Sequence, residues 1–432
     1  MRAQGSTVDR ADLPVWPVGL FFVGFPVWWM LGLAAFLIPL TAVPMAIVLL
    51  TRGRGIRLPA ALLPWCVFLL LVLASAVMLD SLLRGVGFAL RLGNYLGAAV
   101  ALLYVYNARH RLPVGKVAAL LTLFWLVVVA GGWLGVILPG GSLHTPVSVV
   151  LPDSLMSNEY VRDLVIPKFA EIRSPWGSPV VFARPSAPFP YTNAWGLNFA
   201  LSTPFAVYTM VRHRRRFVRL TLAAALVASI VPAAATLNRG MFVALAFAGA
   251  YSAFRLALRG RLMALVALCA GAIVLIAGLQ TLGFGEQLAT RAQYSQSSEG
   301  RGALYAETFD ATLRSPLLGY GAPRPSPNSS VSLGTQGQLW NVMFSHGFVA
   351  LLAFELFFLA VLWRSRRAAT AERLLPHVVV ATALVTHIYY GLNGPELMTT
   401  MVAAGLALRL HTDHEPPEPA VEAFRPLAGA MR

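Results

Sequence analysis

The residues best suited to chemistry are arginines that lie beside long apolar runs. Arg239 precedes Gly240 in LNRGMF, and Arg301 opens the helical pattern RGALYAETFDATLR. Arg184 lies in the proline-rich stretch ARPSAPFPYTNAWG. A guanidinium group keeps its charge in apolar surroundings and binds two phosphate oxygens at once. These positions favour an anion site, although an arginine that reaches the lipid headgroups is the alternative for Arg239.

Candidates for acid–base chemistry lie in the later half of the chain. Glu307 and Asp310 are close enough in sequence to share a helix face with Arg314 or Arg301, and a salt-bridged, solvated helix is the alternative. Gln336 and His346 lie in SLGTQGQLWNVMFSHGF, just before a long apolar run. A neutral carboxamide can orient a hydroxyl group but cannot take its proton, whereas a carboxylate or an imidazole can do both.

Charged residues inside apolar runs are costly, so each is a functional candidate. Arg91 lies within such a run and could pair with Asp80 or with Glu396, which begins the last run. Tyr320 lies in the turn GYGAP, which could form the rigid edge of a pocket. The secondary candidates for the site are therefore Arg91, Arg314, Tyr320 and Glu396.

The composition is that of a membrane protein. Of 432 residues, 57% are hydrophobic and 12% are charged, with a mean hydropathy of +0.67, whereas soluble domains carry about 25% charged residues. The net charge of +16 does not indicate a nucleic-acid-binding face, because more than half of the 34 basic residues fall in short clusters between apolar runs. Such clusters mark cytoplasmic turns. They span residues 52–57, 109–116, 212–219, 255–261 and 364–373.

Twelve apolar runs could cross a membrane, since a spanning helix needs about 20 residues. With twelve spans, every basic cluster and both termini are cytoplasmic; with eleven, the N-terminus would lie outside and the clusters would not move. We predict an all-α, polytopic membrane helical bundle over residues 1–410. The runs are 15–31, 33–50, 59–79, 85–106, 117–138, 193–211, 218–236, 240–256, 262–283, 338–362, 374–391 and 395–410.

Two long segments, 139–192 and 284–337, then face the extracytoplasmic side. Both have balanced charge and recurring aromatic residues, which favours ordered loops with a functional role. Residues 411–432, which contain HEPPEP, are expected to form a disordered cytoplasmic tail. Cys66 and Cys269 give neither a disulfide framework nor a thiolate metal site, and no HExxH occurs, so we expect no metal and no cofactor.

Three of these stretches resemble the O-antigen ligase and O-antigen polymerase superfamily of bacterial envelope glycan assembly. LNRGMF resembles the family's Arg-Gly at the start of a span, and GRGALYAETFDATLRSPLLGYGA resembles its arginine-led helix ending in a Pro-x-x-Gly-x-Gly turn. TQGQLWNVMFSHGFVALLAF resembles a span start that usually reads His-Asn, then aliphatic residues, then a glycine eleven positions on. The expected layout of about twelve spans with a large late outer loop is similar as well.

The resemblance implies a GT-C-like glycosyltransferase of the bacterial plasma (inner) membrane. Members transfer a glycan from a polyprenyl-diphosphate carrier to an acceptor hydroxyl on the extracytoplasmic side, inverting the anomeric centre without a metal. The donor is thus a lipid-linked glycan, and the acceptor is a glycan or glycolipid. By position, the resemblance implies that Arg239 and Arg301 bind the diphosphate, and we expect Arg184 to contribute a third cation.

The chain departs from the family pattern at one position. Counting back eleven residues from Gly347 reaches Gln336, where the family has the histidine proposed as base or acceptor-orienting residue. We rank Gln336 first among the catalytic candidates and Glu307 second, as a base on a loop helix. His346 ranks third because it lies about 15 Å further along the helix. The departure is compatible with a different base, with a weak or inactive variant, or with an introduced substitution.

Two alternatives come from other functional classes. Twelve spans with both ends inside would also suit a secondary transporter or a flippase for lipid-linked glycans, but the arginines gather at the outer mouth rather than at the membrane midplane. A non-catalytic relative that only binds the donor is the other alternative. Ligase and polymerase share the donor chemistry and differ in the acceptor, so the sequence does not separate them.

Overall fold

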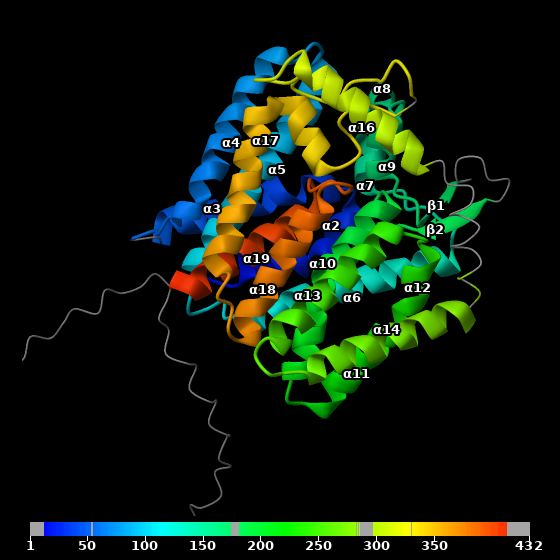
Figure 1. Cartoon of the computed structure of the whole chain (residues 1–432). Coiled ribbons are helices and arrows are strands. Elements are labelled where there is room, and N and C mark those ends of the chain that lie inside the picture. The colour runs from blue at the N-terminus through cyan, green and yellow to red at the C-terminus, as the bar shows by residue number, and fades with distance from the viewer. Residues whose placement is uncertain are drawn as a thin grey trace, which may run out of the picture.

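Helices account for almost all of the secondary structure in the described part of the chain (Figure 1). The computed structural model describes residues 13–52, 55–173, 181–281, 283, 285, 297–329 and 331–412. The all-α, polytopic membrane architecture is confirmed, because 7 helices in these ranges are long and apolar enough to cross a membrane. These helical segments are Ala34–Thr51, Ala60–Met78, Leu82–Asn107, Val114–Ile137, Arg216–Ala235, Arg239–Ala257 and Gln338–Ser365.

The remaining expected spans are helical but shorter or less apolar. The first run forms α1 (Trp16–Phe22) and α2 (Phe25–Leu31), of 7 residues each, and a helix of that length rises only about 10 Å. Four later runs form α10 (Thr192–Arg212), α14 (Met263–Thr281), α18 (Ala371–Thr386) and α19 (Pro395–Thr412). The number of twelve spans therefore stays a prediction. The expected tail begins inside α19, and its residues 413–432 lie outside the described ranges.

Local sequence signals explain several helix boundaries. Asn238 caps α13 by accepting a hydrogen bond from the backbone N–H of Met241, and Ser81 caps α5 in the same way. Gly32 ends α2 with a φ of 82°, a conformation that favours glycine. The other helices of the bundle are α3 (Leu37–Arg52), α4 (Leu63–Ala74), α5 (Leu82–Asn107), α6 (Val114–Ile137), α11 (Arg216–Ala228), α12 (Ile230–Ala235), α13 (Arg239–Ala257), α14 (Met263–Thr281) and α17 (Gln338–Ser365).

The basic clusters are joined to one another at one end of the bundle. Arg212 pairs with Glu372 at 3.2 Å, and Arg255 donates a hydrogen bond to the backbone carbonyl of Arg366. The backbone N–H of Arg57 donates to the last residue of α5, which precedes the second cluster. Such a gathering is typical of the cytoplasmic end of a membrane bundle.

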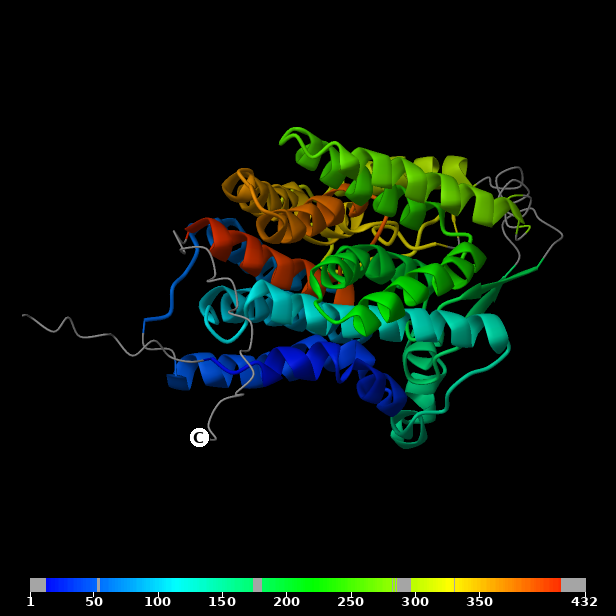
Figure 2. The same ribbon diagram turned by 90° about the horizontal axis from the view of Figure 1, so that it is seen from below.

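The two long loops lie at the opposite end, where they build short elements of their own (Figure 1). The first loop contains a small antiparallel hairpin, β1 (Ala170–Arg173) with β2 (Phe182–Pro185), which the prediction of an all-α fold did not include. The hairpin lies beyond one end of the long helices, away from the end of α19 (Figure 2). The helices of the loops are α7 (Pro146–Val150), α8 (Asp153–Met156), α9 (Glu159–Val165) and α16 (Ser297–Leu313).

Candidate functional site

A cavity of about 910 Å³ lies where the two outer loops meet the ends of the helices. Its walls come from α1, α2, α3, α5 and α10, from both outer loops, and from the segment between α18 and α19. The lining includes aromatic and proline side chains as well as charged ones. The ionisable candidates that line it, other than tyrosine, are Arg91, Arg184, Arg301, Asp163, Glu171 and Glu396, together with the neutral Gln336.

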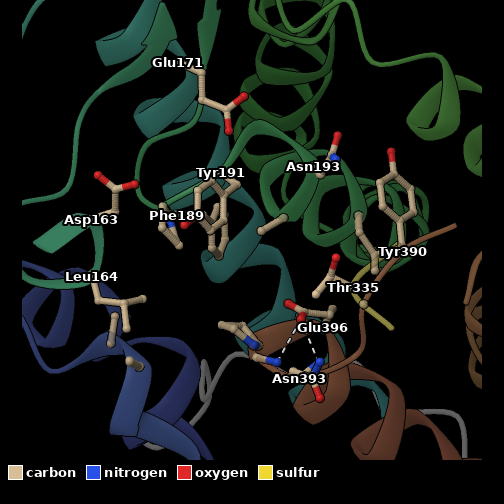
Figure 3. Close-up of a pocket in the computed structure, with 18 of the residues that line it drawn as sticks. Asp163, Leu164, Glu171, Phe189, Tyr191, Asn193, Thr335, Tyr390, Asn393 and Glu396 are labelled. Carbon is tan, nitrogen blue, oxygen red and sulfur yellow. Dashed lines mark hydrogen bonds between the residues drawn. The ribbon is translucent and has the colours of Figure 1, made fainter. Parts of the chain in front are cut away.

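Glu396 forms part of this lining at the start of α19 (Figure 3). One carboxylate oxygen accepts hydrogen bonds from the backbone N–H groups of Asn393, at 3.1 Å, and Gly394, at 2.8 Å. The other oxygen accepts from Nδ2 of Asn198, at 3.0 Å. The side chain is thus fixed at a helix N-terminus, where a negative charge is favoured. Glu396 is only 6% exposed.

The segment that follows α18 is held by hydrogen bonds from two helices, α5 and α17. Asn94 on α5 donates to the carbonyl of Asn393, at 2.7 Å, and the hydroxyl of Tyr95 donates to its side-chain oxygen, at 3.2 Å. Gln338, the first residue of α17, donates to the Tyr95 hydroxyl and accepts from the backbone N–H of Leu392. Gln338, two residues after Gln336, therefore joins the start of α17 by hydrogen bonds to the segment that precedes Glu396.

The opposite wall is formed by the hairpin of the first loop. Glu171 and Arg184 face each other as cross-strand partners, and their side chains form an ion pair at 3.4 Å. Nε of Arg184 also donates to the carbonyl of Thr236, at 2.7 Å. Asp163, from α9, pairs with Lys168 at 3.2 Å. In Figure 3, Asp163 and Glu171 lie across the cavity from Glu396, with Tyr191 between.

Three further candidates complete the polar lining. Arg301 is exposed near the start of α16, and Gln336 lies two residues ahead of α17. Arg91 lines the cavity from α5 and is partly buried. One of the two partners considered for Arg91 in sequence, Asp80, pairs instead with Arg84, at 2.5 Å, and with Arg324 at 3.4 Å.

Five of the sequence candidates do not belong to the cavity lining. Arg239 is exposed as the first residue of α13, beside a glycine that packs against the lining residue Tyr390. The carboxylate of Glu307 accepts a hydrogen bond from Ser326, at 2.9 Å. His346 is buried, and its Nδ1 lies 2.7 Å from the hydroxyl of Ser75. The other two are Arg314 and Tyr320, at and beyond the end of α16.

Sequence reasoning missed several contributors to the site. Asn198, Gln338 and Asn393 are uncharged residues within or beside apolar runs, and their pairing depends on four different helices. One signal was present for the last segment: Asn393-Gly394-Pro395-Glu396 has a proline at the first helical position and an acid directly after it, as helix starts often have. That signal predicts where α19 begins but not that Glu396 faces a cavity.

The fold and the site define a polytopic helical membrane protein with a polar, arginine-lined cavity at one end. A comparison with family models identifies residues 224–354 as a match to the family described as O-Antigen ligase. The matched segment contains Arg239, Arg301 and Gln336. The resemblance to the O-antigen ligase and polymerase superfamily is thereby confirmed for residues 224–354, which are similar to an O-antigen ligase domain. A comparison with curated proteins gives no match.

Proposed function

We propose that this protein transfers a glycan from a polyprenyl-diphosphate carrier to an acceptor hydroxyl in the cavity at the outer end of the bundle. The observation that carries the proposal is that Arg91, Arg184, Arg301 and Gln336 line one cavity at the end opposite the basic clusters. The matching family supports glycan transfer in a membrane. The apolar bundle offers a medium for the lipid tail, and the outer loops enclose space for sugars.

The donor site in this proposal is built from guanidinium groups. A glycosyl diphosphate reacts when the C–O bond to the anomeric carbon breaks and negative charge grows on the leaving diphosphate. Preorganised donors aimed at such charge typically lower the barrier by about 3 kcal/mol each. Arg301 is the foremost ligand because it lines the cavity and is exposed rather than buried in the bundle. Arg91 and Arg184 are further ligands in the lining, and Arg239 is proposed as a ligand at the edge.

Arg184 also has a structural partner, which limits its freedom. Its ion pair with Glu171 and its bond to Thr236 hold the guanidinium group against the hairpin. A group held in advance costs little ordering free energy when the ligand arrives, although one carboxylate already offsets part of its charge. We therefore assign Arg184 an orienting contribution and Arg301 the larger share of charge stabilisation.

The acceptor hydroxyl must lose its proton as the new glycosidic bond forms. Gln336 can orient this hydroxyl through its carboxamide but cannot take the proton. Among the carboxylates of the lining, Asp163 and Glu171 are each engaged in an ion pair, with Lys168 and Arg184 respectively. Glu396 is held by three uncharged donors instead. We propose Glu396 as the base that accepts the proton, ahead of Glu307, whose carboxylate is occupied by Ser326.

Metal independence is part of the proposal, since fixed guanidinium groups would neutralise the diphosphate. The test is transfer between a synthetic polyprenyl-diphosphate glycan and a lipid or glycan acceptor in proteoliposomes containing excess EDTA. Full product formation in EDTA supports the proposal. Activity restored only by Mg²⁺ or Mn²⁺ would exclude metal independence, and counterflow of labelled donor without any new glycosidic bond would favour the transporter alternative.

A further inference from the structure

The long helix α17 is interrupted inside the membrane-spanning stretch. Gly347 has φ 84° and ψ 175°, which are not helical values, so the helix consists of residues 338–346 and 348–365. The break lies about 14 Å from the start of the helix. Within a membrane the backbone groups freed by such a break must find partners in the protein, because lipid offers none.

The freed groups are satisfied by the turn that follows α16. In an unbroken helix the carbonyl of Phe344 would accept from the N–H of Phe348. Here that carbonyl accepts from the N–H of Tyr320, at 3.0 Å, and the N–H of Phe348 donates to the carbonyl of Pro316, at 2.8 Å. The next carbonyl along, that of residue 345, accepts from the N–H of residue 321 at 2.7 Å. The turn of residues 316–321 is thus inserted into the helix break.

Two glycines make this insertion possible. A Cβ atom on Gly347 would lie 2.5 Å from the carbonyl oxygen of Leu317, and one on Gly319 would lie 2.4 Å from the carbonyl oxygen of Phe344. Both glycines also have positive φ, at 84° and 60°. The close approach involves backbone atoms on both sides, so neither collision can be relieved by moving a flexible side chain.

The inserted turn also anchors α16 to its neighbours. The Tyr320 ring stacks on Phe344 of α17, with centroids 4.7 Å apart, and its hydroxyl donates to the carbonyl of Ala311 on α16. Arg324 lies over the same ring at 4.8 Å and pairs with Asp80, ahead of α5. A hydrogen bond from Arg84 lowers the pKa of Asp80, so this carboxylate stays charged at neutral pH.

We infer that Gly319 and Gly347 are positioning residues for the reaction: the turn inserted into α17 fixes Arg301, at the other end of α16, relative to Gln336 at the start of α17. Both side chains line the same cavity, and both are carried by the elements that meet at the break. The roles assigned to Arg301 and Gln336 rest on the proposed function, whereas the spacing between their helices does not.

The first test is a distance measurement that needs no activity. Spin labels on Ala303→Cys in α16 and Thr335→Cys ahead of α17 are placed in a background lacking the two exposed native thiols, Cys66 and Cys269. Gly347→Ala is expected to shift or broaden the label-to-label distance distribution. The matched control is Gly271→Ala on α14, where an added Cβ meets nothing within 4 Å. An unchanged, narrow distribution in Gly347→Ala would overturn the inference.

A second test uses turnover. Misplacement of reacting groups by about 1 Å costs on the order of 100-fold in rate, and we expect a loss of that order for Gly347→Ala. If the loss arises because Arg301 is misplaced, combining it with Arg301→Lys should cost less than the product of the two single losses. If the double variant loses rate by the full product of the two single losses, Gly347→Ala damages the protein independently of Arg301, and the inference is overturned.

A backbone variant covers the case in which Gly347→Ala does not fold. Phe348→Pro removes the N–H that donates to Pro316, and proline is well suited to the first position of the second helical half. Phe348→Leu keeps that N–H and serves as the control. The proline variant should change the distance distribution and the leucine variant should not; equal behaviour would contradict the inference. If Arg301→Ala left transfer intact, the proposed role of Arg301 would fail, while the distance measurement would still decide whether the inserted turn sets the spacing between the two helices.

Discussion

The ring of Tyr305 on α16 lies flat against the indole of Trp340 on α17, with centroids 4.2 Å apart and 9° between the ring planes. Each ring is about one helical turn beyond a cavity residue, Arg301 on α16 and Gln336 ahead of α17. Burial raises the pKa of Tyr305, so its phenol remains neutral over the physiological range. The stack therefore joins the two elements close to the cavity, as the inserted turn joins them further away.

Loss of this stack should slow transfer moderately. Stacked aromatic pairs are worth about 1 kcal/mol beyond their buried area, and Tyr305→Leu should therefore reduce the initial rate of glycan transfer by about fivefold. Tyr305→Phe keeps the ring and is the matched control, with a rate close to that of the parent protein. A Tyr305→Leu variant with the parent rate would show that the stack does not contribute to the site.

Removal of the proposed diphosphate ligands should abolish most transfer. Arg301→Ala and Arg239→Ala are each expected to lower the turnover rate by at least about 100-fold, with an unchanged elution profile in detergent. Arg301→Lys should be intermediate, because an ammonium group keeps the charge but loses the paired hydrogen bonds.

The control for both is Arg162→Ala, an exposed arginine of the first outer loop that does not line the cavity. It should transfer at the parent rate. Near-normal turnover in either the Arg239 or the Arg301 variant would remove that residue from the site.

A histidine in place of Gln336 should make the rate of glycan transfer depend on pH. Gln336→His places an imidazole in the cavity lining, and a neutral imidazole is a base whereas its protonated form is not. The variant should be faster than the parent protein, and its rate should rise as pH increases through about 6.5. Unchanged or slower transfer across pH 5.5–8 would argue that this position is not a lost base.

The proposed role of Glu396 as the proton acceptor can be tested by replacing its carboxylate with an amide of nearly the same shape. Glu396→Gln keeps an oxygen that can accept from the backbone N–H groups of Asn393 and Gly394, but an amide is not basic. We expect transfer to fall by about 100-fold while donor binding, measured with a fluorescent polyprenyl-diphosphate analogue, changes little.

Asn198→Ala is the companion variant, because it removes one partner of Glu396 and keeps the carboxylate. Its loss of rate should be much smaller than that of Glu396→Gln. Equal losses in both variants, together with a lower melting temperature, would assign Glu396 a purely structural role.

The orientation of the bundle is testable by thiol labelling. In a background without native cysteines, Ser157→Cys of the first outer loop should react with an impermeant maleimide added to intact cells. Arg261→Cys, in the basic cluster between α13 and α14, should react only after permeabilisation. Both positions are exposed. The reverse pattern would place the cavity in the cytosol and would contradict the proposed use of an extracytoplasmic acceptor.

Much of the architecture could be predicted from the sequence because the membrane imposes simple rules. Long apolar runs must be helical, since lipid offers no hydrogen bonds to the backbone, and basic clusters mark one side. These rules gave the helices and the separation of the basic clusters from the two outer loops. The short pair α1 and α2 shows their limit: the first run was long and apolar, but its helices of 7 residues each are too short to cross alone.

The composition of the cavity was decided by tertiary structure. Arg184, Arg301 and Gln336 stood out by residue type and by their glycine or proline neighbours, and they do line one cavity. The sequence held no comparable signal for the role of Glu396, because its partners come from a residue almost 200 positions away and from the backbone of a turn. Hydrogen bonds of this kind depend on which helices become neighbours, and local pattern carries no information on that.

Gly319 and Gly347 likewise separate what the sequence determined from what the tertiary structure decided. The sequence by itself determined that a turn follows α16 and that a glycine lies within α17, because glycine allows backbone conformations that other residues rarely adopt. Only the folded chain brings Gly319 to within reach of Phe344, and Gly347 to within reach of Leu317. A break in a membrane helix is stable only when another segment supplies the missing hydrogen bonds, and the identity of that segment is a property of the packed bundle.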